Sequence, residues 1–257
     1  MGLSMITRAA VLEAKRVAVV IPAYCEARLI GRTLRDLPSF VDAIYVVDDC
    51  STDATASQAR ACSDTRLRVL RHETNRGVGA TIVTGYRAAL CEHADVVAVM
   101  AGDAQMHPDD LEAVVRPVAA GRADYVKGNR FTSELRRNMP WSRRAAGKLL
   151  SALTRWASGL QVDDCQCGYT AIGEQALRAL PLGELWPRFG YPNDLLLLLA
   201  QHGMRVDEVT VRPVYADERS GIRPWHALLI VGLILRRLLL GRGALKQRAA
   251  LADVGEG

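Results

Sequence analysis

Three polar side chains stand at every second position after a short apolar run in the middle of the chain. Asp103, Gln105 and His107 follow Val96–Met100, a run rich in β-branched residues that is typical of a buried strand. Open α/β sheets bind ligands just past the carboxyl ends of such strands. Carboxylate and amide oxygens suit Mg²⁺ or Mn²⁺ shared with substrate phosphates. The spacing predicts either such a site or a plain turn before a helix at Pro108.

A second acidic pair follows another apolar run, at residues 43–47. Asp48 and Asp49 come directly after this expected strand, and either hydroxyl of Ser51–Thr52 can cap a helix that begins near Asp53. The two carboxylates therefore either bind a ligand at the edge of the sheet or only cap this helix.

Strands and helices alternate along the chain, which predicts an α/β fold with a mainly parallel sheet and right-handed crossovers. Strands are expected at Arg16–Ile21, Ala43–Val47, Leu67–Leu70, Val96–Met100, Tyr125–Gly128, Tyr169–Ile172 and Val206–Pro213. Helices are expected at Glu26–Leu37, from about Asp53, from the turn at 75–79 to Leu90, at 145–159 and at Tyr191–Ala200, with a loop at Phe131–Arg144. We expect one domain over residues 1–223 and an appended segment over 224–257.

Composition points to an anionic partner. The 257 residues carry a formal net charge of +5, and only 5% of them are aromatic. A basic balance suits a nucleotide, a phospholipid or a nucleic acid, but few aromatic residues argue against stacking on single-stranded bases. We expect no nucleic-acid partner. Six scattered cysteines without a signal peptide predict a reducing, cytoplasmic environment rather than a disulfide framework.

The segment Pro224–Leu240 is apolar on nearly every side but is interrupted by Arg236 and Arg237. Its length of about sixteen residues is short of the roughly twenty that cross a bilayer. With Trp225 at one end and basic residues after the other, it is typical of a helix lying in a membrane interface. The alternative is a helix that packs on the domain or on a second subunit. We expect a peripheral protein on the cytoplasmic face of the membrane.

Seven ordered motifs identify a family resemblance. They are IPAYCE (Ile21–Glu26), VVDDCSTD (Val46–Asp53), NRGVGAT (Asn75–Thr81), GDAQMHPDDL (Gly102–Leu111), KGNRF (Lys127–Phe131), DCQCGY (Asp164–Tyr169) and YPND (Tyr191–Asp194). Together they resemble the inverting glycosyltransferases of family 2, which have the GT-A fold with a Rossmann-like sheet. The QCGY stretch and Asp217–Arg223 are most similar to the dolichyl- or polyprenyl-phosphate sugar synthases.

The resemblance implies a site for a nucleotide-sugar donor. In this family the first strand and the loop after it hold the base, Asp49 would accept a hydrogen bond from the base ring, and Asp48 would support it. The implied donor residues are Pro22, Ala23, Tyr24, Glu26, Asp48, Asp49, Arg76, Gly79, Gly102, Asp103 and Ala104.

The metal motif departs from the family pattern. Family members usually carry Asp-x-Asp, often with Gln two positions on, and here Ala101 takes the place of the first acid. The implied ligands of Mg²⁺ or Mn²⁺ are therefore Asp103 and Gln105.

The resemblance implies that Arg130 lies near phosphate and that Asp164, Gln166 and Asp194 face the sugar and the acceptor. An acceptor phosphate needs only positioning and charge neutralisation, whereas a hydroxyl acceptor needs a base, for which Asp194 is the candidate. The alternative role for Asp194 is a helix N-cap. The residues expected to bind the acceptor phosphate are Arg136 and Arg137, from the basic loop, and Arg219, Ser220 and Arg223, which match a late phosphate-binding stretch of similar enzymes. The alternative for the last three is a solvated turn.

The predicted activity is transfer of a sugar, with inversion, from a UDP- or GDP-sugar to a polyprenyl phosphate. One alternative keeps this donor but uses a soluble hydroxyl acceptor, such as a natural-product scaffold or a small glycan. The other is a nucleotide-sugar binding protein without catalysis, which the missing acid at Ala101 would explain. The sequence leaves the oligomeric state open, a homo-oligomer included.

Overall fold

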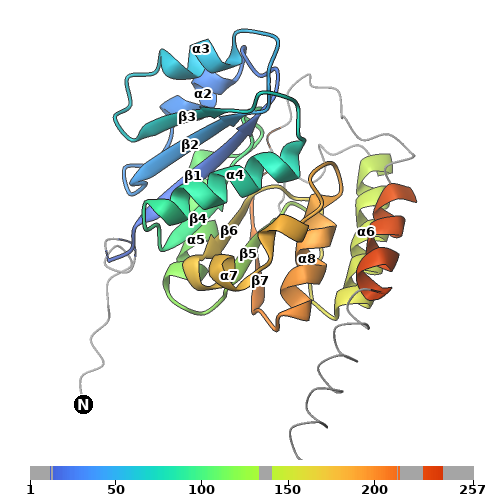
Figure 1. Cartoon of the computed structure of the whole chain (residues 1–257). Coiled ribbons are helices and arrows are strands. Elements are labelled where there is room, and N and C mark those ends of the chain that lie inside the picture. The colour runs from blue at the N-terminus through green and yellow to red at the C-terminus, as the bar shows by residue number, and fades with distance from the viewer. Residues whose placement is uncertain (1–11, 13, 133–140, 213, 215–227, 240–257) are drawn as a thin grey trace, which may run out of the picture.

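A seven-stranded sheet forms the centre of the computed structural model, which describes residues 12, 14–132, 141–212, 214 and 228–239 (Figure 1). The strands are β1 (Val17–Ala23), β2 (Ala43–Asp48), β3 (Leu67–Arg71), β4 (Val96–Val99), β5 (Tyr125–Asn129), β6 (Thr170–Gly173) and β7 (Val206–Thr210). Their order across the sheet is β3-β2-β1-β4-β6-β5-β7. Only β6 runs antiparallel to its neighbours, β4 and β5, so the mainly parallel sheet expected from the sequence is confirmed.

Helices cover both faces of this sheet (Figure 1). They are α2 (Ile30–Arg35), α3 (Thr55–Arg60), α4 (Val78–Cys91), α5 (Leu111–Ala119), α6 (Trp141–Ser158), α7 (Glu174–Ala179) and α8 (Tyr191–Gln201). Short 3₁₀ turns stand at Pro108–Asp110 and Leu182–Glu184, and residues 228–239 form a further helix beside α6.

Alternate residues of the central strands belong to different cores. Ala18 and Val20 of β1 pack with Ile82 of α4, in a cluster that also contains buried residues of α7 and α8. Val19 and Ile21 point to the opposite face, in a cluster with α2, α3 and α5. Strands covered on both faces read as continuous apolar runs, which is why these segments were recognisable in the sequence.

Two local expectations were wrong. The helix after β2 begins at Thr55 with Ala54 as its N-cap, and no side chain caps it. The hydroxyl of Ser51 instead accepts a hydrogen bond from the backbone N–H of Cys25 in the neighbouring loop, 2.9 Å away. α6 begins at Trp141, inside the segment expected to be a loop.

The helix at residues 228–239 packs on the domain with one face. Ile230, Leu233 and Ile234 are buried, whereas Leu235 and Leu239 on the other face are 53% and 70% exposed. Among the residues that the structure describes, no helix combines the length and the apolarity needed to cross a membrane. The described part of the expected C-terminal helix therefore joins the hydrophobic core and also leaves apolar side chains at the surface.

Candidate active site

A pocket of about 300 Å³ opens where β1, β2 and β4 end, and we call it the β1–β4 pocket. It is lined by Pro22, Ala23, Tyr24, Glu26, Asp49, Asn75, Gly77, Val78, Thr81, Ala101, Gly102 and Asp103. The structure thus brings most of the residues predicted for the donor to one place. The carboxyl ends of parallel strands meet at one edge of the sheet, which is why segments far apart in the sequence converge here.

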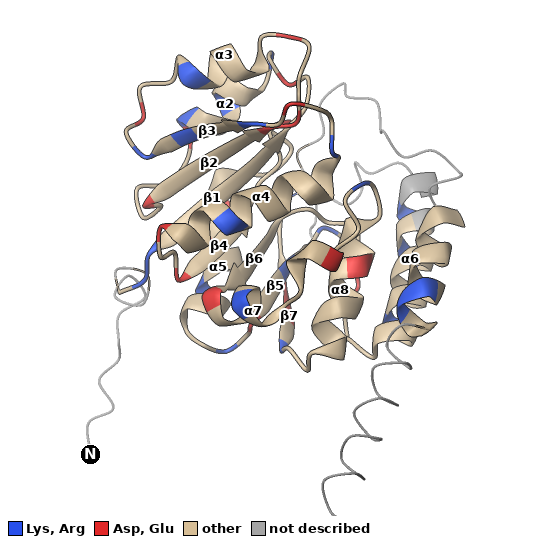
Figure 2. Ribbon diagram, viewed as in Figure 1, with Lys and Arg blue, Asp and Glu red and all other residues tan. Residues whose placement is uncertain are grey.

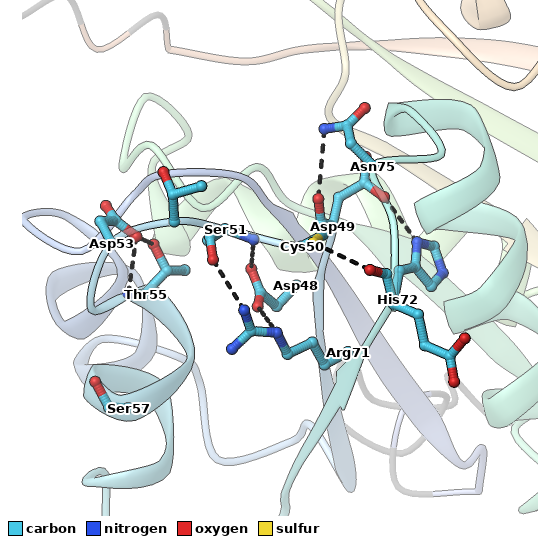
Figure 3. Close-up of polar contacts among 12 residues, drawn as sticks. Asp48, Asp49, Cys50, Ser51, Asp53, Thr55, Ser57, Arg71, His72 and Asn75 are labelled. Carbon is cyan, nitrogen blue, oxygen red and sulfur yellow. Dashed lines mark hydrogen bonds and ion pairs between the residues drawn. The ribbon is translucent and has the colours of Figure 1, made fainter.

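The side chain of Asp49 accepts three hydrogen bonds at this pocket, and the one from His72 is drawn in Figure 3. Its Oδ1 accepts hydrogen bonds from the N–H of Arg76 at 2.9 Å and from Nδ1 of His72 at 2.7 Å. Its Oδ2 accepts the N–H of Gly77 at 2.7 Å. A carboxylate offers about four acceptor positions, so one remains for a ligand. Asp49 therefore shapes the loop at 75–77 in addition to facing the pocket.

Asp48 supports the turn beneath the pocket and does not line it. Its carboxylate is fully buried and accepts the N–H of Ser51 at 3.1 Å, and Nε of Arg71 lies 3.3 Å from its Oδ2. Arg71 also donates to the carbonyl oxygen of Ser51 at 2.9 Å, so the two side chains close the turn together (Figure 3). The predicted supporting role fits this geometry, and helix capping does not.

Three other residues predicted for the donor are not among those that line the β1–β4 pocket. Arg76 contributes its backbone N–H to Asp49, and Ala104 lines a different hollow together with Arg32 and His107. A Cβ placed on Gly79 would lie 2.3 Å from the carbonyl oxygen of Trp186. The absence of a side chain at Gly79 thus allows the chain's own loop to approach, rather than a phosphate.

Asp103 lines both the β1–β4 pocket and a smaller adjoining pocket of about 50 Å³. The smaller pocket, which we call the Arg130 pocket, is lined by Asp103, Gln105, Met106, Arg130, Cys167, Gly168, Tyr169, Val211, Arg212 and Val214. Within the described part of the chain, no group of three or more His, Cys, Asp or Glu side chains could hold a metal ion. One carboxylate with one amide fits a cation that keeps several waters and shares the phosphates of a substrate.

Arg130 is fixed in the Arg130 pocket by Asp164. Nε and Nη2 of the guanidinium donate to the two carboxylate oxygens at 2.7 and 2.9 Å, and the backbone N–H of Arg130 donates to Oδ2 at 3.1 Å. Asp164 is fully buried, and its own N–H donates to Glu208 at 2.9 Å. Burial raises the pKa of Glu208. Asp164 therefore orients Arg130 and is not among the residues that line either pocket, so its predicted contact with the sugar or the acceptor stays a prediction.

Gln166 lies in a polar chain that joins three elements. Its Nε2 donates to Oδ1 of Asn193 at 2.6 Å, and Nδ2 of Asn193 donates to the hydroxyl of Thr154 in α6 at 2.7 Å. The loop before β6, the first turn of α8 and α6 are thereby held in register. Gln166 does not line either of the two pockets above, so its predicted contact with the sugar or the acceptor stays a prediction.

Asp194 is neither an exposed base nor an N-cap. Its carboxylate is fully buried and accepts Nε and Nη2 of Arg237 at 2.6 and 3.0 Å, and the N–H of Trp186 at 2.8 Å. The hydrogen bonds that Arg237 donates to Asp194 raise the pKa of Arg237, and Gly190 is the N-cap of α8. A fully buried carboxylate that is bound by a guanidinium and a backbone N–H presents no exposed oxygen to a hydroxyl acceptor.

The residues predicted for the acceptor phosphate, Arg136, Arg137, Arg219, Ser220 and Arg223, lie outside the described residues.

Sequence reasoning missed His72 and Arg212 as residues of this region. His72 directly follows β3, so its place at the strand's carboxyl end could have drawn attention to it. Arg212 lies just after β7, and its guanidinium pairs with Asp110 at 2.8 Å. Each signal is a single polar residue after a strand. Such residues are common, so this signal alone is weak evidence for a functional site.

The chain is similar to a known protein family and to several named proteins. The sequence model described as glycosyl transferase family 2 matches residues 18–178. The undecaprenyl-phosphate mannosyltransferase of Micrococcus luteus is 32% identical over 202 residues, which cover 76% of this chain and 82% of that protein. The UDP-N-acetylglucosamine–dolichyl-phosphate N-acetylglucosaminyltransferase of Methanococcus voltae is 26% identical, over 89% of this chain and 97% of the relative.

Solved structures show the same fold at lower identity. Glucosyl-3-phosphoglycerate synthase from Mycobacterium tuberculosis, in complex with Mn²⁺, UDP and phosphoglyceric acid, superposes with a TM-score of 0.68. The two chains are 21% identical, and the match covers 93% of this chain and 84% of that one. The fold, the family match and the relatives together confirm the resemblance seen in the motifs. The chain belongs to glycosyltransferase family 2 and is an enzyme of that family, in which inversion at the anomeric carbon is typical.

Proposed function

We propose that the enzyme transfers a sugar from a nucleoside-diphosphate sugar to a polyprenyl phosphate. The observation that carries the choice of acceptor is the burial of Asp194. A hydroxyl acceptor needs a base to take its proton, and the carboxylate predicted for that role is held by Arg237 and by the N–H of Trp186. A phosphate acceptor is already an anion and needs no such base. Relatives whose names specify undecaprenyl-phosphate and dolichyl-phosphate transferases support the same acceptor.

The proposed reaction is one in-line displacement. A phosphate oxygen of the acceptor attacks the anomeric carbon, the bond from that carbon to the diphosphate oxygen breaks, and the electron pair leaves with the nucleoside diphosphate. The products are a polyprenyl phosphosugar of inverted configuration and the nucleoside diphosphate, without net uptake or release of a proton at the acceptor. Catalysis then rests on positioning and on charge stabilisation.

The two adjoining pockets suit these two substrates. The donor would lie in the β1–β4 pocket, with its base near Asp49 and its diphosphate near Asp103. The guanidinium of Arg130, whose orientation is fixed by Asp164, would bind the acceptor phosphate in the Arg130 pocket. Since Asp103 lines both pockets, the anomeric carbon would lie close to this residue.

A divalent cation fits Asp103 and Gln105 when a diphosphate shares its shell. When bound, Mg²⁺ or Mn²⁺ would supply charge neutralisation at the departing diphosphate. The Mn²⁺ and UDP complexes of the glucosyl-3-phosphoglycerate synthase support this proposal through the shared fold.

An apolar surface supports a lipid acceptor. Leu149 and Trp156 of α6 are 62% and 76% exposed, and Leu228, Leu235 and Leu239 on the neighbouring helix are exposed as well. Basic side chains lie along α6 among these residues (Figure 2). Apolar and basic side chains on adjacent helices suit the interface of an anionic bilayer. We propose that this surface, the α6 patch, rests on the cytoplasmic face of the membrane.

The experiment is a transfer assay with radiolabelled UDP- and GDP-sugars. One arm offers a polyprenyl phosphate in detergent, a second offers the same polyprenol without its phosphate, and a third offers soluble sugars and phosphoglyceric acid. Label should enter the organic phase only in the first arm, and only with Mg²⁺ or Mn²⁺. Label transferred to a soluble acceptor but not to the lipid phosphate would replace our proposal with the alternative acceptor.

A further inference from the structure

A continuous set of contacts joins the C-terminal helix to the wall of the β1–β4 pocket. It begins at Arg237, which is only 2% exposed and lies in the helix at residues 228–239. The guanidinium donates to both oxygens of Asp194, and its Nη2 also donates to the carbonyl oxygen of Glu184 at 2.8 Å. One side chain thereby holds both ends of the segment between η3 (Leu182–Glu184) and α8.

The next contact passes through Asp194 to the loop before α8. The Oδ2 atom that accepts from Arg237 also accepts the backbone N–H of Trp186, at 2.8 Å. The indole Nε1 of Trp186 donates to the carbonyl oxygen of Phe189 at 2.9 Å, which closes the loop on itself. The position of residues 186–190 is therefore set by a buried carboxylate, whose own orientation is set by Arg237.

This loop then forms the support of the pocket wall. The carbonyl oxygen of Pro187 accepts the N–H of Ala80 at 3.0 Å, and Arg188 donates to the side-chain and backbone oxygens of Asn75 at 3.3 Å. Side chains at Gly77 and Gly79 would collide with residues 186–188, so the two segments lie in direct contact. Asn75, Gly77 and Val78 of the supported segment line the β1–β4 pocket.

We infer that Arg237 is a positioning residue for the donor: through Asp194 and the loop at 186–190 it fixes the 75–80 wall of the β1–β4 pocket. The inference rests on the proposed function only in naming the pocket's ligand. It gives the C-terminal helix a role in the activity that is separate from contact with a membrane. Arg236, the neighbouring residue, is exposed, so it provides a matched control.

The first test is hydrogen–deuterium exchange on the protein without ligand. In Arg237→Met, amide exchange should rise at least tenfold at residues 75–80 and 186–191, with no change in β4. Arg237→Lys should restore part of the protection, and Arg236→Met should match the wild type. Faster exchange confined to residues 228–239 and 184–186, with 75–80 unchanged, would overturn the inference.

A second variant distinguishes loss of the positioning contacts from general unfolding of the protein. Removing one member of a buried ion pair leaves an uncompensated charge, whereas removing both charges does not. Arg237→Met combined with Asp194→Asn keeps an oxygen for the N–H of Trp186 and removes only the link to the helix. This double variant should melt close to the wild type and still show faster exchange at 75–80. Wild-type exchange there, in a folded double variant, contradicts the positioning role.

Kinetics separate positioning from general damage. In the folded double variant we expect the KM for the nucleotide sugar to rise at least fivefold, while kcat and the KM for the acceptor stay within twofold. An equal loss of kcat with an unchanged donor KM argues for damage at the reaction centre and against the inference. If the wild type transfers no sugar, the proposed function fails, but the exchange experiment still decides the role of Arg237.

Discussion

The imidazole of His72 lies between Asp49 and Thr84, with Nδ1 2.7 Å from the carboxylate and Nε2 2.9 Å from the hydroxyl. An ionised carboxylate can only accept, so Nδ1 carries the proton and Nε2 accepts from Thr84 in the neutral ring. The bond fixes the carboxylate that also holds the N–H groups of Arg76 and Gly77. His72 thus holds the carboxylate that shapes the loop at 75–77.

The first prediction concerns this pair. His72→Phe should lower the free energy of unfolding by about 1–3 kcal/mol, because a buried carboxylate and a hydroxyl lose their partner. It should also weaken binding of UDP or GDP, since Asp49 can turn. Urea denaturation and calorimetric titration with UDP and GDP measure the two effects. His93→Asn is the control, because His93 is exposed and has a φ of +59°, which Asn tolerates well. Equal stability of His72→Phe and wild type would show that the pair is dispensable.

The second prediction concerns the cation. Asp103→Asn should remove most of the transfer activity while the fold survives, because Asp103 is only partly buried and lies at the mouth of two pockets. Ala101→Asp should tighten metal binding by adding a second carboxylate next to the first. Asp207→Asn, in an exposed position of β7, serves as the control. Metal-dependent turnover is the measurement, and undiminished turnover in Asp103→Asn would place the cation elsewhere.

The third prediction uses two helix glycines. Gly79→Ala should destabilise the protein by about 1–3 kcal/mol and weaken donor binding, because its Cβ would meet the carbonyl oxygen of Trp186 at 2.3 Å. Gly31→Ala in α2 has nothing within 4 Å of the new Cβ and should be neutral or stabilising. Thermal melts with and without UDP compare the two variants. Equal melting temperatures of the two variants, with and without UDP, would mean that the loop at 186–190 moves aside without a cost in stability or in nucleotide binding.

The fourth prediction is a dependence of stability on pH. Burial lowers the pKa of Lys127 from its ordinary value of 10.5, and its ammonium donates to the carbonyl oxygen of Cys167 at 2.7 Å. Between the lowered and the ordinary pKa the unfolded chain binds more protons than the folded one, so stability rises with pH across this interval. The unfolding free energy of the wild type minus that of Lys127→Met should increase as pH is raised toward 10.5. Urea melts over a pH series measure this difference, and a constant value would contradict the assignment.

The fifth prediction concerns the α6 patch. The wild type should float with anionic liposomes, less so at high salt, and weakly with neutral ones, because basic side chains add on the order of 1 kcal/mol each near an anionic surface. Trp156→Gln with Leu235→Gln should abolish flotation without lowering the melting temperature, since both side chains are more than half exposed. Truncation before residue 224 is a poor substitute, because it would also remove the buried Ile230 and Arg237. A wild type that fails to float with either liposome would count against the membrane proposal.

The fold was predictable because its signals are local. Buried strands such as β2 and β4 read as short apolar runs, and Asp49 and Asp103 stand where those runs stop. The side-chain partners were not predictable in this way. Asp164 pairs with Arg130 across 34 residues and Asp194 with Arg237 across 43, and nothing in the neighbouring sequence marks either pair. The sequence alone therefore predicted that both carboxylates contact the substrates, whereas in the folded protein each is paired with an arginine.

The antiparallel strand β6 separates the sheet into a larger part with β3, β2, β1 and β4 and a smaller part with β5 and β7. On one side of β6, Glu26 lies after β1 and Asp49 lies after β2. On the other side, Arg130 lies after β5 and Arg212 lies after β7. β4, with Asp103 after it, stands at the boundary between them. If the donor and the acceptor bind as we propose, we expect substitutions after β5 and β7 to alter acceptor preference without affecting the donor. A new acceptor could then evolve while recognition of the nucleotide stays unchanged.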